Sequence, residues 1–289
     1  MKTIVFRTQL PLIAMAILAV FVLASAASAK RILVDLGRSD GTNGVDTPAG
    51  PDVNGNHWNN YSSVASPIPA SGFSLSNLID DTGAASAIGL ETFAVAGGGS
   101  FSSNGLLNGG LSAAASHSDA KDPDGPTFDA GSAQFGLRPA ADYAIATVTG
   151  DYWFTSNTTG AGIKITGLNP SLTYDLDLFG TRDTNTFRVT RYTATGANSG
   201  FQDLFTSGAD IGSDGQYDGN DQYVVNINGI APTAAGEIDL VVSQGQFNGS
   251  GLGTFFYIGA LGINFIPEPA TSLLLCLGGA TLAMVRRRN

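Results

Sequence analysis

The sequence predicts an all-β fold, an antiparallel β-sandwich of the jelly-roll type. Apolar residues recur at every second position in short runs, and clusters of Gly, Asn, Asp and Pro separate these runs. Glycine accounts for 38 of the 289 residues, roughly twice its average frequency, which indicates many turns. Helical periodicity is confined to short segments, so strands are expected to build the core.

The strand pattern is clearest in residues 172–178. Apolar side chains alternate there with polar ones, including Asp175 and Asp177, as in a strand with one face on a core and one in water. Residues 168–171 predict a hairpin turn to a strand at 162–167. The other predicted strands are 32–36, 88–96, 187–195, 223–228, 238–243 and 255–265, with short helices at 75–81 and 139–146 and loops at 97–110 and 116–131.

The first 29 residues have the order of a secretion signal. Lys2 and Arg7 form a basic leader, residues 10–24 are apolar, and Ala27-Ser28-Ala29 fits the small-x-small cleavage pattern. The 15 apolar residues are fewer than the roughly 20 that a membrane span needs. We therefore expect signal peptidase to release a mature chain that begins at Lys30.

The C-terminal end carries a second targeting pattern. Pro267-Glu268-Pro269 is followed by the uncharged residues 270–285 and then by Arg286-Arg287-Arg288. As a helix, residues 270–285 would be about 24 Å long, slightly less than the hydrocarbon core of a bilayer. The positive-inside rule places the arginines in the cytoplasm. We expect a single apolar helix that holds the chain in the membrane.

This order of features resembles the PEP-CTERM sorting signal, which is also catalogued as an ice-binding-protein C-terminal domain. The resemblance covers residues 266–289, with Ile266 where the family usually has valine. It implies that exosortase, a membrane transpeptidase, cuts near Pro267-Glu268-Pro269. The protein would then reside in the cell envelope, on the surface or in the extracellular matrix, after transient anchoring by the C-terminal helix. A C-terminal anchor that is never cut is the alternative, because both need the same span.

The sequence is thus divided into a signal peptide at 1–29, one exported β-sandwich domain at 30–266 and a sorting tail at 267–289. The domain resembles uncharacterised secreted proteins with a galactose-binding-like sandwich, a resemblance that implies a fold more than a function. It rests on the following stretches: Ile32-Leu33-Val34-Asp35-Leu36-Gly37, Trp58-Asn59-Asn60, Ile165-Thr166-Gly167-Leu168-Asn169-Pro170, Phe179-Gly180-Thr181-Arg182 and Phe256-Tyr257-Ile258-Gly259-Ala260-Leu261.

Charge and cysteine content narrow the choice of partners. The exported domain holds 9 basic and 23 acidic residues, a formal charge of −14. Nucleic acid is not an expected partner, because binding to phosphates needs clustered Lys and Arg. Cys276, the one cysteine, lies in the tail, so the domain forms no disulfide and depends on packing or bound ions.

An acidic loop at residues 210–221 is the calcium candidate. Read as a 12-residue calcium loop, it has oxygen ligands at positions 1, 5, 9 and 12, which are Asp210, Asp214, Asp218 and Asp221. Glycine stands at position 6, as expected, but also at position 3, and no helices flank the loop. Ordinary turn chemistry is the alternative, because Asp, Asn and Gly are the common turn residues.

Aromatic residues in polar surroundings are the candidates for carbohydrate binding. Trp58, Asn59, Asn60 and Tyr61 combine rings that can stack on a sugar with amides that can bind its hydroxyl groups. Burial of Trp58 at one end of the sandwich is the alternative. The other aromatic residues considered are Tyr152, Trp153, Tyr217 and Tyr223, of which Trp153 is expected in the core.

No motif for catalysis is found. His57 and His117 belong to no G-x-S-x-G, H-E-x-x-H or P-loop pattern. The pair Asp175 and Asp177 has a spacing compatible with glycosidase carboxylates, but a solvated strand face is the favoured interpretation, because the alternation alone explains the pair. The expectation is a non-catalytic surface or matrix protein that binds extracellular polysaccharide. A secreted polysaccharide hydrolase and a purely structural matrix component are the alternatives.

Overall fold

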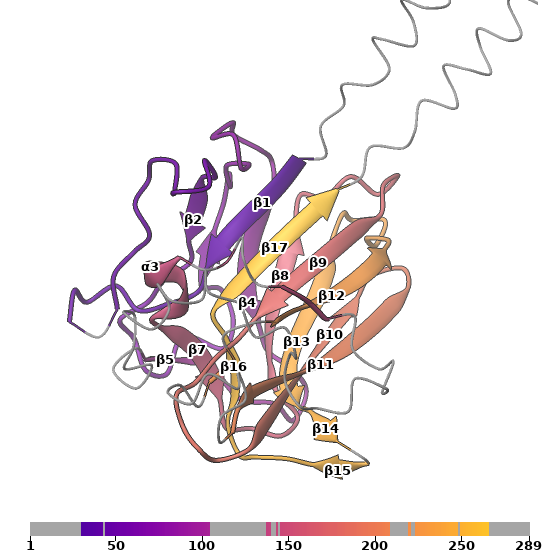
Figure 1. Cartoon of the computed structure of the whole chain (residues 1–289). Coiled ribbons are helices and arrows are strands. Elements are labelled where there is room, and N and C mark those ends of the chain that lie inside the picture. Colours follow the sequence, from indigo (N-terminus) through magenta and orange to yellow (C-terminus); the bar gives the residue numbers. More distant parts are fainter. Residues whose placement is uncertain are drawn as a thin grey trace, which may run out of the picture. The chain divides into compact units, whose positions relative to one another are not determined.

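Two β-sheets of six strands each build the body of the protein in the computed structural model (Figure 1). The structure describes residues 30–42, 44–104, 137–139, 143, 145–208, 219–220, 223–247 and 249–265. These residues belong to one compact unit, Lys30–Phe265. The segments expected to be the signal peptide and the sorting tail lie outside the described residues, and so do the four aspartates expected to bind calcium.

The first sheet, sheet I, contains both ends of the described unit. Its strands pair antiparallel except for β1 and β2, which run parallel. In spatial order they are β2 (Trp58–Asn60), β1 (Lys30–Asp35), β17 (Ala260–Phe265), β9 (Tyr174–Phe179), β12 (Tyr223–Ile230) and β6 (Leu137–Pro139).

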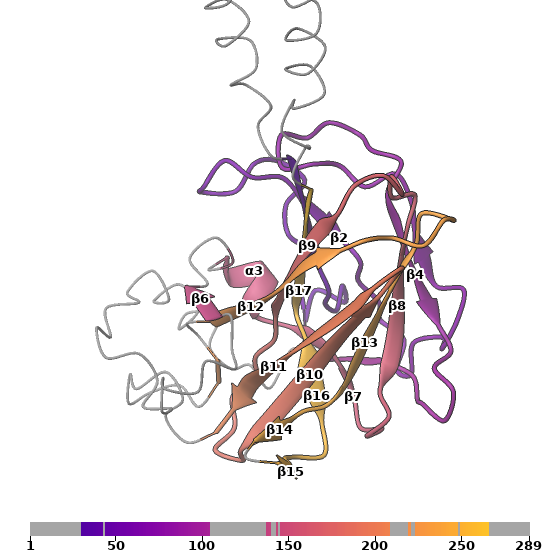
Figure 2. The same cartoon turned by 90° about the vertical axis from the view of Figure 1, so that its right-hand side faces the viewer.

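The second sheet, sheet II, is antiparallel throughout and appears as one layer in Figure 2. In spatial order its strands are β11 (Ser199–Ser207), β10 (Arg188–Thr195), β13 (Ile238–Gln244), β8 (Ala161–Thr166), β4 (Gly89–Phe93) and β3 (Ser74–Leu75). Smaller elements are a three-stranded sheet of β16 (Phe256–Ile258), β7 (Tyr152–Thr155) and β5 (Ser102–Asn104), the pair β14 (Gln246–Phe247) and β15 (Ser250–Gly251), and the helix α3 (Ala146–Thr149).

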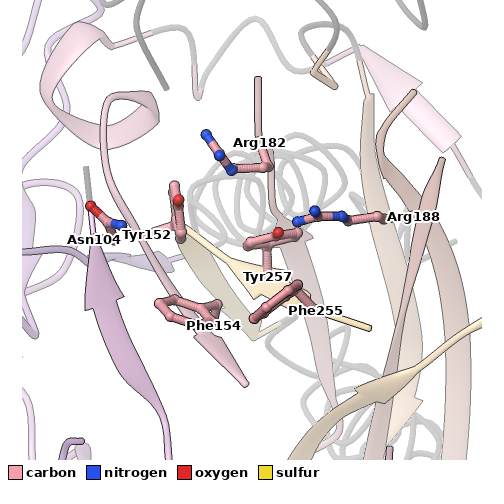
Figure 3. Close-up of a pocket in the computed structure, with 7 residues that line it drawn as sticks. All are labelled: Asn104, Tyr152, Phe154, Arg182, Arg188, Phe255 and Tyr257. Carbon is pink, nitrogen blue, oxygen red and sulfur yellow. The ribbon is translucent and has the colours of Figure 1, made fainter. Parts of the chain in front are cut away.

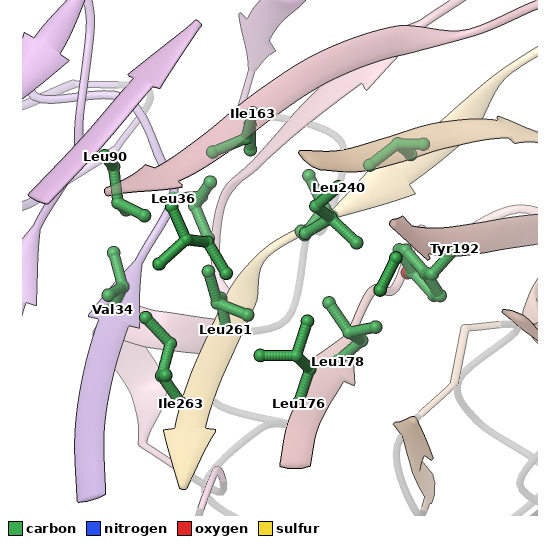
Figure 4. Packing of buried hydrophobic residues seen from close by; sticks show 14 of the residues in the cluster. Val34, Leu36, Leu90, Ile163, Leu176, Leu178, Tyr192, Leu240, Leu261 and Ile263 are labelled. Carbon is green, nitrogen blue, oxygen red and sulfur yellow. The ribbon is translucent and has the colours of Figure 1, made fainter. Parts of the chain in front are cut away.

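The two large sheets enclose one hydrophobic core (Figure 4). Sheet I contributes side chains such as Leu176 and Leu261, and sheet II contributes side chains such as Ile163 and Leu240; all four are fully buried. In β9 the residues at alternate positions enter this core, as the period of two predicts. The predictions of an all-β fold and of antiparallel sheets are therefore confirmed.

The predicted hairpin at residues 168–171 is wrong. Strand β8 pairs with β13 and β4 in sheet II, whereas β9 pairs with β12 and β17 in sheet I. The turn therefore carries the chain from one sheet to the other. The amide of Leu168 bonds to the carbonyl of Gly236 and the amide of Asn169 to the hydroxyl of Tyr174. A local turn signal cannot distinguish this sheet change from a hairpin, because both need the same chain reversal.

Two other local predictions are also corrected. Residues 75–81 are not helical, because Leu75 belongs to β3 and Ile79 forms a bridge with Ala85. The predicted loop at 97–110 contains strand β5. In the described part of the chain, no helix has the length and apolar character that a membrane span requires.

Candidate functional site

The three-stranded sheet has one face in the core and one face outside it. Trp153 and Ile258 are opposite each other in β7 and β16, and both are fully buried in the main core. Their neighbours at alternate positions, Tyr152, Phe154 and Tyr257, project from the other face. The alternation of the strands thus separates a core face from an aromatic face.

The aromatic face forms the floor of a pocket of about 120 Å³ (Figure 3). Strands β5, β7 and β10, the loop after β9 and the residues around the start of β16 contribute to it. The residues that line it are Asn104, Tyr152, Phe154, Arg182, Arg188, Phe255 and Tyr257.

The rings of the pocket pack edge against face. The centroids of Tyr152 and Tyr257 are 5.1 Å apart with an interplanar angle of 86°. Those of Phe154 and Phe255 are 5.7 Å apart at 61°. Such contacts are attractive because the positive ring edge faces the negative ring face. The aromatic floor is therefore held in a defined arrangement before any ligand arrives.

Arg188 lies over this floor. Its Cζ atom is 5.0 Å from the ring centroid of Phe255 and 5.6 Å from that of Tyr257. The Nε atom is buried and has no hydrogen-bond partner within the described part of the chain. Burial and the neighbouring charge of Arg182 lower the pKa of Arg188. The site therefore contains a partly desolvated cation with a donor left to satisfy.

The local backbone explains why Arg188 points into the pocket. The register between β10 and β11 shifts between Arg188 and Val189, which marks an irregularity where the ladder begins. Such irregularities turn a side chain away from its regular direction. Gly253, with φ of +83°, lies against the side chain of Arg188, and a Cβ atom there would be 2.9 Å from its Cγ. Glycine thus leaves room for the arginine stem.

Charge also acts on Tyr152, one of the two tyrosines that line the pocket. Burial raises the pKa of Tyr152 to about 12, although Arg182 and Arg188 act in the opposite direction. Tyr152 is therefore a neutral hydroxyl group at physiological pH. With the amide of Asn104, it offers hydrogen bonds beside the two guanidinium groups.

The arrangement suits a ligand in which a small anionic group is attached to a sugar ring with an apolar C–H face. Guanidinium groups bind carboxylate and sulfate oxygens through paired N–H donors, and aromatic faces accept the C–H face of a sugar. A volume of about 120 Å³ is below the roughly 300 Å³ at the lower end of pockets for drug-sized ligands. The seven lining residues include no Asp, Glu, His, Ser or Cys, so this pocket holds no pair of groups for glycosidase chemistry.

Trp58 and Tyr61, the aromatic residues expected to stack on sugar, are instead buried, each 2% exposed. Trp58 donates from Nε1 to Asp52 at 2.8 Å. The ring of Tyr61 packs on Trp153 at 4.7 Å. Protein therefore covers the ring faces, and the expectation of stacking at these two residues is corrected.

Asn59 and Asn60 are engaged in backbone hydrogen bonds. The amide of Asn59 donates to the carbonyls of Leu33 and Ile79, and that of Asn60 donates to the carbonyl of Thr47. These bonds attach β2 and its flanking loops to sheet I. Their role in the structure is to satisfy backbone groups at the sheet edge.

The prediction that Asp175 and Asp177 share a solvated strand face is wrong for Asp177, which is fully buried. Its carboxylate accepts hydrogen bonds from Tyr143, Asn226 and Asn264 at 3.2, 2.6 and 2.9 Å. A second hydrophobic cluster covers this outer face of sheet I, and Val148 of α3 belongs to it. Figure 2 shows α3 on that side of sheet I. The cluster comprises Leu33, Trp58, Tyr143, Val148, Phe179, Val224 and Ala260.

The remaining predicted site residues divide into two groups. His57 is partly exposed, and its ring nitrogen lies 3.3 Å from the carbonyl of Ala49. Within the ranges that the structure describes, no three His, Cys, Asp or Glu side chains gather as a metal site. The candidate calcium ligands and the sorting residues lie outside these ranges, as do His117 and Tyr217. The candidate calcium ligands are Asp210, Asp214, Asp218 and Asp221. The sorting residues are Pro267, Glu268, Pro269, Arg286, Arg287 and Arg288.

Sequence reasoning found only part of the pocket. Tyr152 was among the aromatic candidates, whereas Phe154, Phe255, Arg182 and Arg188 were not. The available signal was the spacing of aromatic residues at every second position in 152–154 and 255–257. The arginines gave no local signal, because they reach the pocket from other parts of the chain, Arg182 from the loop after β9 and Arg188 from β10.

Comparison with models of known protein families, with curated proteins and with solved structures found no match for this chain.

Proposed function

We propose that this protein is an exported, non-catalytic β-sandwich that binds acidic carbohydrate through the pocket of Arg182 and Arg188. The observation that carries the binding role is the position of Arg188, which combines a buried unpaired Nε with two aromatic rings below its guanidinium. A negative group on a sugar would satisfy the arginine. The apolar face of the same sugar would contact Phe154 and Phe255, the partly exposed rings of the pocket.

The size of the pocket defines which part of the ligand enters. About 120 Å³ accommodates a carboxylate or sulfate and the adjoining edge of one sugar, not a buried oligosaccharide. The rest of a polymer would lie outside the pocket, in contact with solvent. This mode suits a polysaccharide that carries one negative group per repeating unit.

Because the domain is acidic, its specificity for an acidic polysaccharide would come from direct contacts in the pocket and not from long-range electrostatic attraction. A formal charge of −14 in residues 30–266 repels a polyanion at a distance. At physiological ionic strength this repulsion is screened beyond about 8 Å. The two arginines act inside that distance, where paired N–H donors and ring contacts determine affinity.

The proposal includes a jelly-roll fold of the galactose-binding-like type. Two sheets with mostly antiparallel pairing around one core support it. Sandwiches of this architecture carry many functions, so the fold alone does not indicate carbohydrate binding. The pocket chemistry is the reason for that part of the proposal.

Export and sorting complete the proposed function. The order of basic leader, apolar stretch and Ala27-Ser28-Ala29 supports cleavage by signal peptidase. The order of Pro267-Glu268-Pro269, apolar segment and three arginines supports processing by exosortase. In this proposal the protein is held transiently in the membrane by its tail and then acts at the cell surface or in extracellular polysaccharide.

Titration calorimetry with the full-length chain tests the binding role. Polygalacturonate oligomers, each unit of which carries a carboxylate, are compared with neutral galactan oligomers of equal length, in the presence of a chelator. We expect at least about tenfold tighter binding of the acidic oligomer, and a loss of about tenfold or more in Arg188→Ala, as charged hydrogen bonds contribute roughly 1.5–3 kcal/mol. Arg188→Lys should recover only part of the lost affinity, because an ammonium group cannot donate two parallel hydrogen bonds to a carboxylate.

Lys164→Ala is the matched control, because it removes a positive charge that pairs with Glu237 at 3.0 Å, and Lys164 is not among the lining residues. Its affinity should stay within about twofold of the unchanged protein, since exposed ion pairs contribute little. Equal binding of acidic and neutral oligomers, or full affinity in Arg188→Ala, would reject the proposed role of the pocket.

A further inference from the structure

Two buried carboxyl groups, one at the end of β1 and one just before β7, each have an oxygen without a hydrogen-bond partner in the described part of the chain. Asp35 pairs with Ala260 in β17, and a Cβ atom on the preceding Gly259 would lie 3.3 Å from the carbonyl oxygen of Asp151, so the two residues are near each other. Asp35, the last residue of β1, and Asp151, the residue before β7, are each 2% exposed. The Oδ1 atoms of both are buried and have no hydrogen-bond partner within the described ranges. Burying an oxygen atom without a hydrogen-bond partner costs free energy. A ligand that binds these two oxygens would remove that cost.

The other oxygen of each group is firmly bound. Thr47 donates its hydroxyl to Oδ2 of Asp35 at 2.7 Å, and the backbone amide of Arg38 donates to Oδ2 of Asp151 at 2.7 Å. The hydroxyl oxygens of Thr47 and Thr147 are also 2.7 Å apart. These contacts connect the end of β1, the following loop and the segment of α3 in one cluster of oxygen atoms.

Glycine allows the backbone to approach Asp151 closely. A Cβ atom on Gly37 would lie 2.1 Å from Oδ1 of Asp151, and one on Gly44 would lie 2.2 Å from Oδ2. Any side chain at either position would displace the carboxylate. The two glycines therefore leave room for the carboxylate of Asp151 beside the loop.

The charged groups around the pair are mostly negative. Burial raises the pKa of Asp35 above its usual value, and burial together with the charge of Asp35 raises the pKa of Asp151. Asp46 adds to both effects, and Asp40 adds to the second. The guanidinium of Arg38 donates to Asp40 at 2.5 Å and to the carbonyl of Ser103 at 3.3 Å. The pair thus needs either a proton or a cation to balance its charge.

We propose that Asp35 and Asp151 bind a calcium ion through their unpaired Oδ1 atoms. Carboxylate and other oxygen ligands are those that calcium prefers, and its flexible coordination accepts waters at the remaining positions. Among the described residues, the contacts of the pair include no histidine or cysteine of the kind that a transition metal favours. It is distinct from residues 210–221 and does not depend on carbohydrate binding.

Such an ion would connect sheet I to the strand that carries the pocket. Asp35 ends β1, and Asp151 immediately precedes Tyr152, a lining residue. The only cysteine of the chain is Cys276, so the domain has no disulfide to tie these elements together. A cation that binds only the folded chain raises its stability by mass action.

Calcium titration of the chelator-treated full-length chain tests the site. We expect saturating calcium to raise the melting temperature by about 5 °C or more. Magnesium at the same concentration should raise it less, because magnesium demands a near-ideal octahedral site. Asp35→Asn and Asp151→Asn should abolish the rise. Both changes keep the side-chain volume and remove a repulsive charge, so the variants should fold.

Asp175→Asn and Asp214→Ala are the controls. The first makes the same chemical change in β9, where Asp175 accepts a hydrogen bond from Gly229 at 2.7 Å. The second removes a ligand of the predicted loop. Both should retain the calcium response in full.

Terbium, a calcium substitute, supplies a readout that is independent of stability. The indole of Trp153 donates to the carbonyl of Gly37 at 3.0 Å, and Gly37 lies against Asp151. Excitation of tryptophan should therefore produce terbium emission that calcium displaces and that Asp151→Asn loses.

Four results would overturn the proposal. They are an absence of both calcium responses in the unchanged protein, an equal response to magnesium, a full response in Asp35→Asn or Asp151→Asn, and a response lost in Asp214→Ala alone. The first would leave the carboxyl pair held by a shared proton, and the last would assign calcium to residues 210–221.

Discussion

The guanidinium of Arg188 lies over the ring of Phe255 with 5.0 Å between Cζ and the ring centroid. A second arginine in the same strand, Arg191, lies over Phe201 at 4.4 Å. Arg191 is neutralised by two hydrogen bonds of 2.7 Å to Asp203. Arg188 has a buried Nε without a partner in the described part of the chain. The comparison separates a structural arginine from one available to an anionic ligand.

Phe255→Leu should weaken binding of the acidic oligomer by about two- to fivefold. The substitution removes the ring below Arg188, and a cation–π contact at a partly exposed site contributes roughly 0.5–1 kcal/mol. Calorimetric titration measures the change. Phe201→Leu is the control, because it removes the ring below Arg191 without touching the pocket. An equal loss of affinity in both variants would contradict a specific role for Phe255.

Tyr192→Phe should lower the free energy of unfolding by about 1–3 kcal/mol. The hydroxyl of Tyr192 is buried and donates to the carbonyl of Tyr257 at 2.6 Å, which connects sheet II to β16. The substitution leaves that carbonyl without its donor. Equilibrium denaturation in urea measures the loss, with an unchanged m-value as the control for two-state unfolding. A loss below about 0.5 kcal/mol would mean that water replaces the hydroxyl.

Asp80→Asn should reduce the loss of folding stability that occurs when the pH falls from about 4 towards 2. Burial alone would raise the pKa of Asp80, but hydrogen bonds from Thr82, Lys30 and Ala84 lower it to about 2. A depressed pKa stabilises the fold above the unfolded value of about 4, and this contribution is lost as the pH falls towards 2.

Melting temperatures between pH 7 and pH 2 measure this effect. The unchanged protein should be more stable than Asp80→Asn at pH 7, and the difference should shrink below about pH 4. A difference that stays constant down to pH 2 would show that the charge of Asp80 is not the cause.

Glu268→Ala should leave the C-terminal tail attached to the exported protein. If exosortase recognises Pro267-Glu268-Pro269, the unchanged protein from a host with this enzyme should lack the segment from about residue 270 onward. Intact mass and membrane fractionation distinguish the two forms, because an uncut apolar segment stays in the bilayer. An unchanged protein whose mass includes Arg286 to Asn289 would refute processing and leave a tail-anchored protein.

The strands with clear alternation are the part of the fold that the sequence predicts well. The run at 172–178 became β9, and the runs at 187–195 and 238–243 became β10 and β13. Side chains on a strand alternate between its two faces, so a core on one face leaves a period of two in the sequence. Strand β11 was missed, because the alternation of 199–207 is weak in a strand whose first half is largely exposed.

The sequence alone therefore determines the strand periodicity and the β class, and it carries the patterns at both ends from which targeting is predicted, because each depends on residues that are close in the chain. Only the tertiary structure decides that Trp58 is covered by protein and that Arg188 meets Phe255. It also brings Asp35 near Asp151, because Asp35 pairs with Ala260 and the preceding Gly259 lies against the backbone of Asp151. These contacts join residues far apart in sequence, and sheet pairing and packing determine them. The local period places a side chain on a face of its strand but leaves open what covers that face.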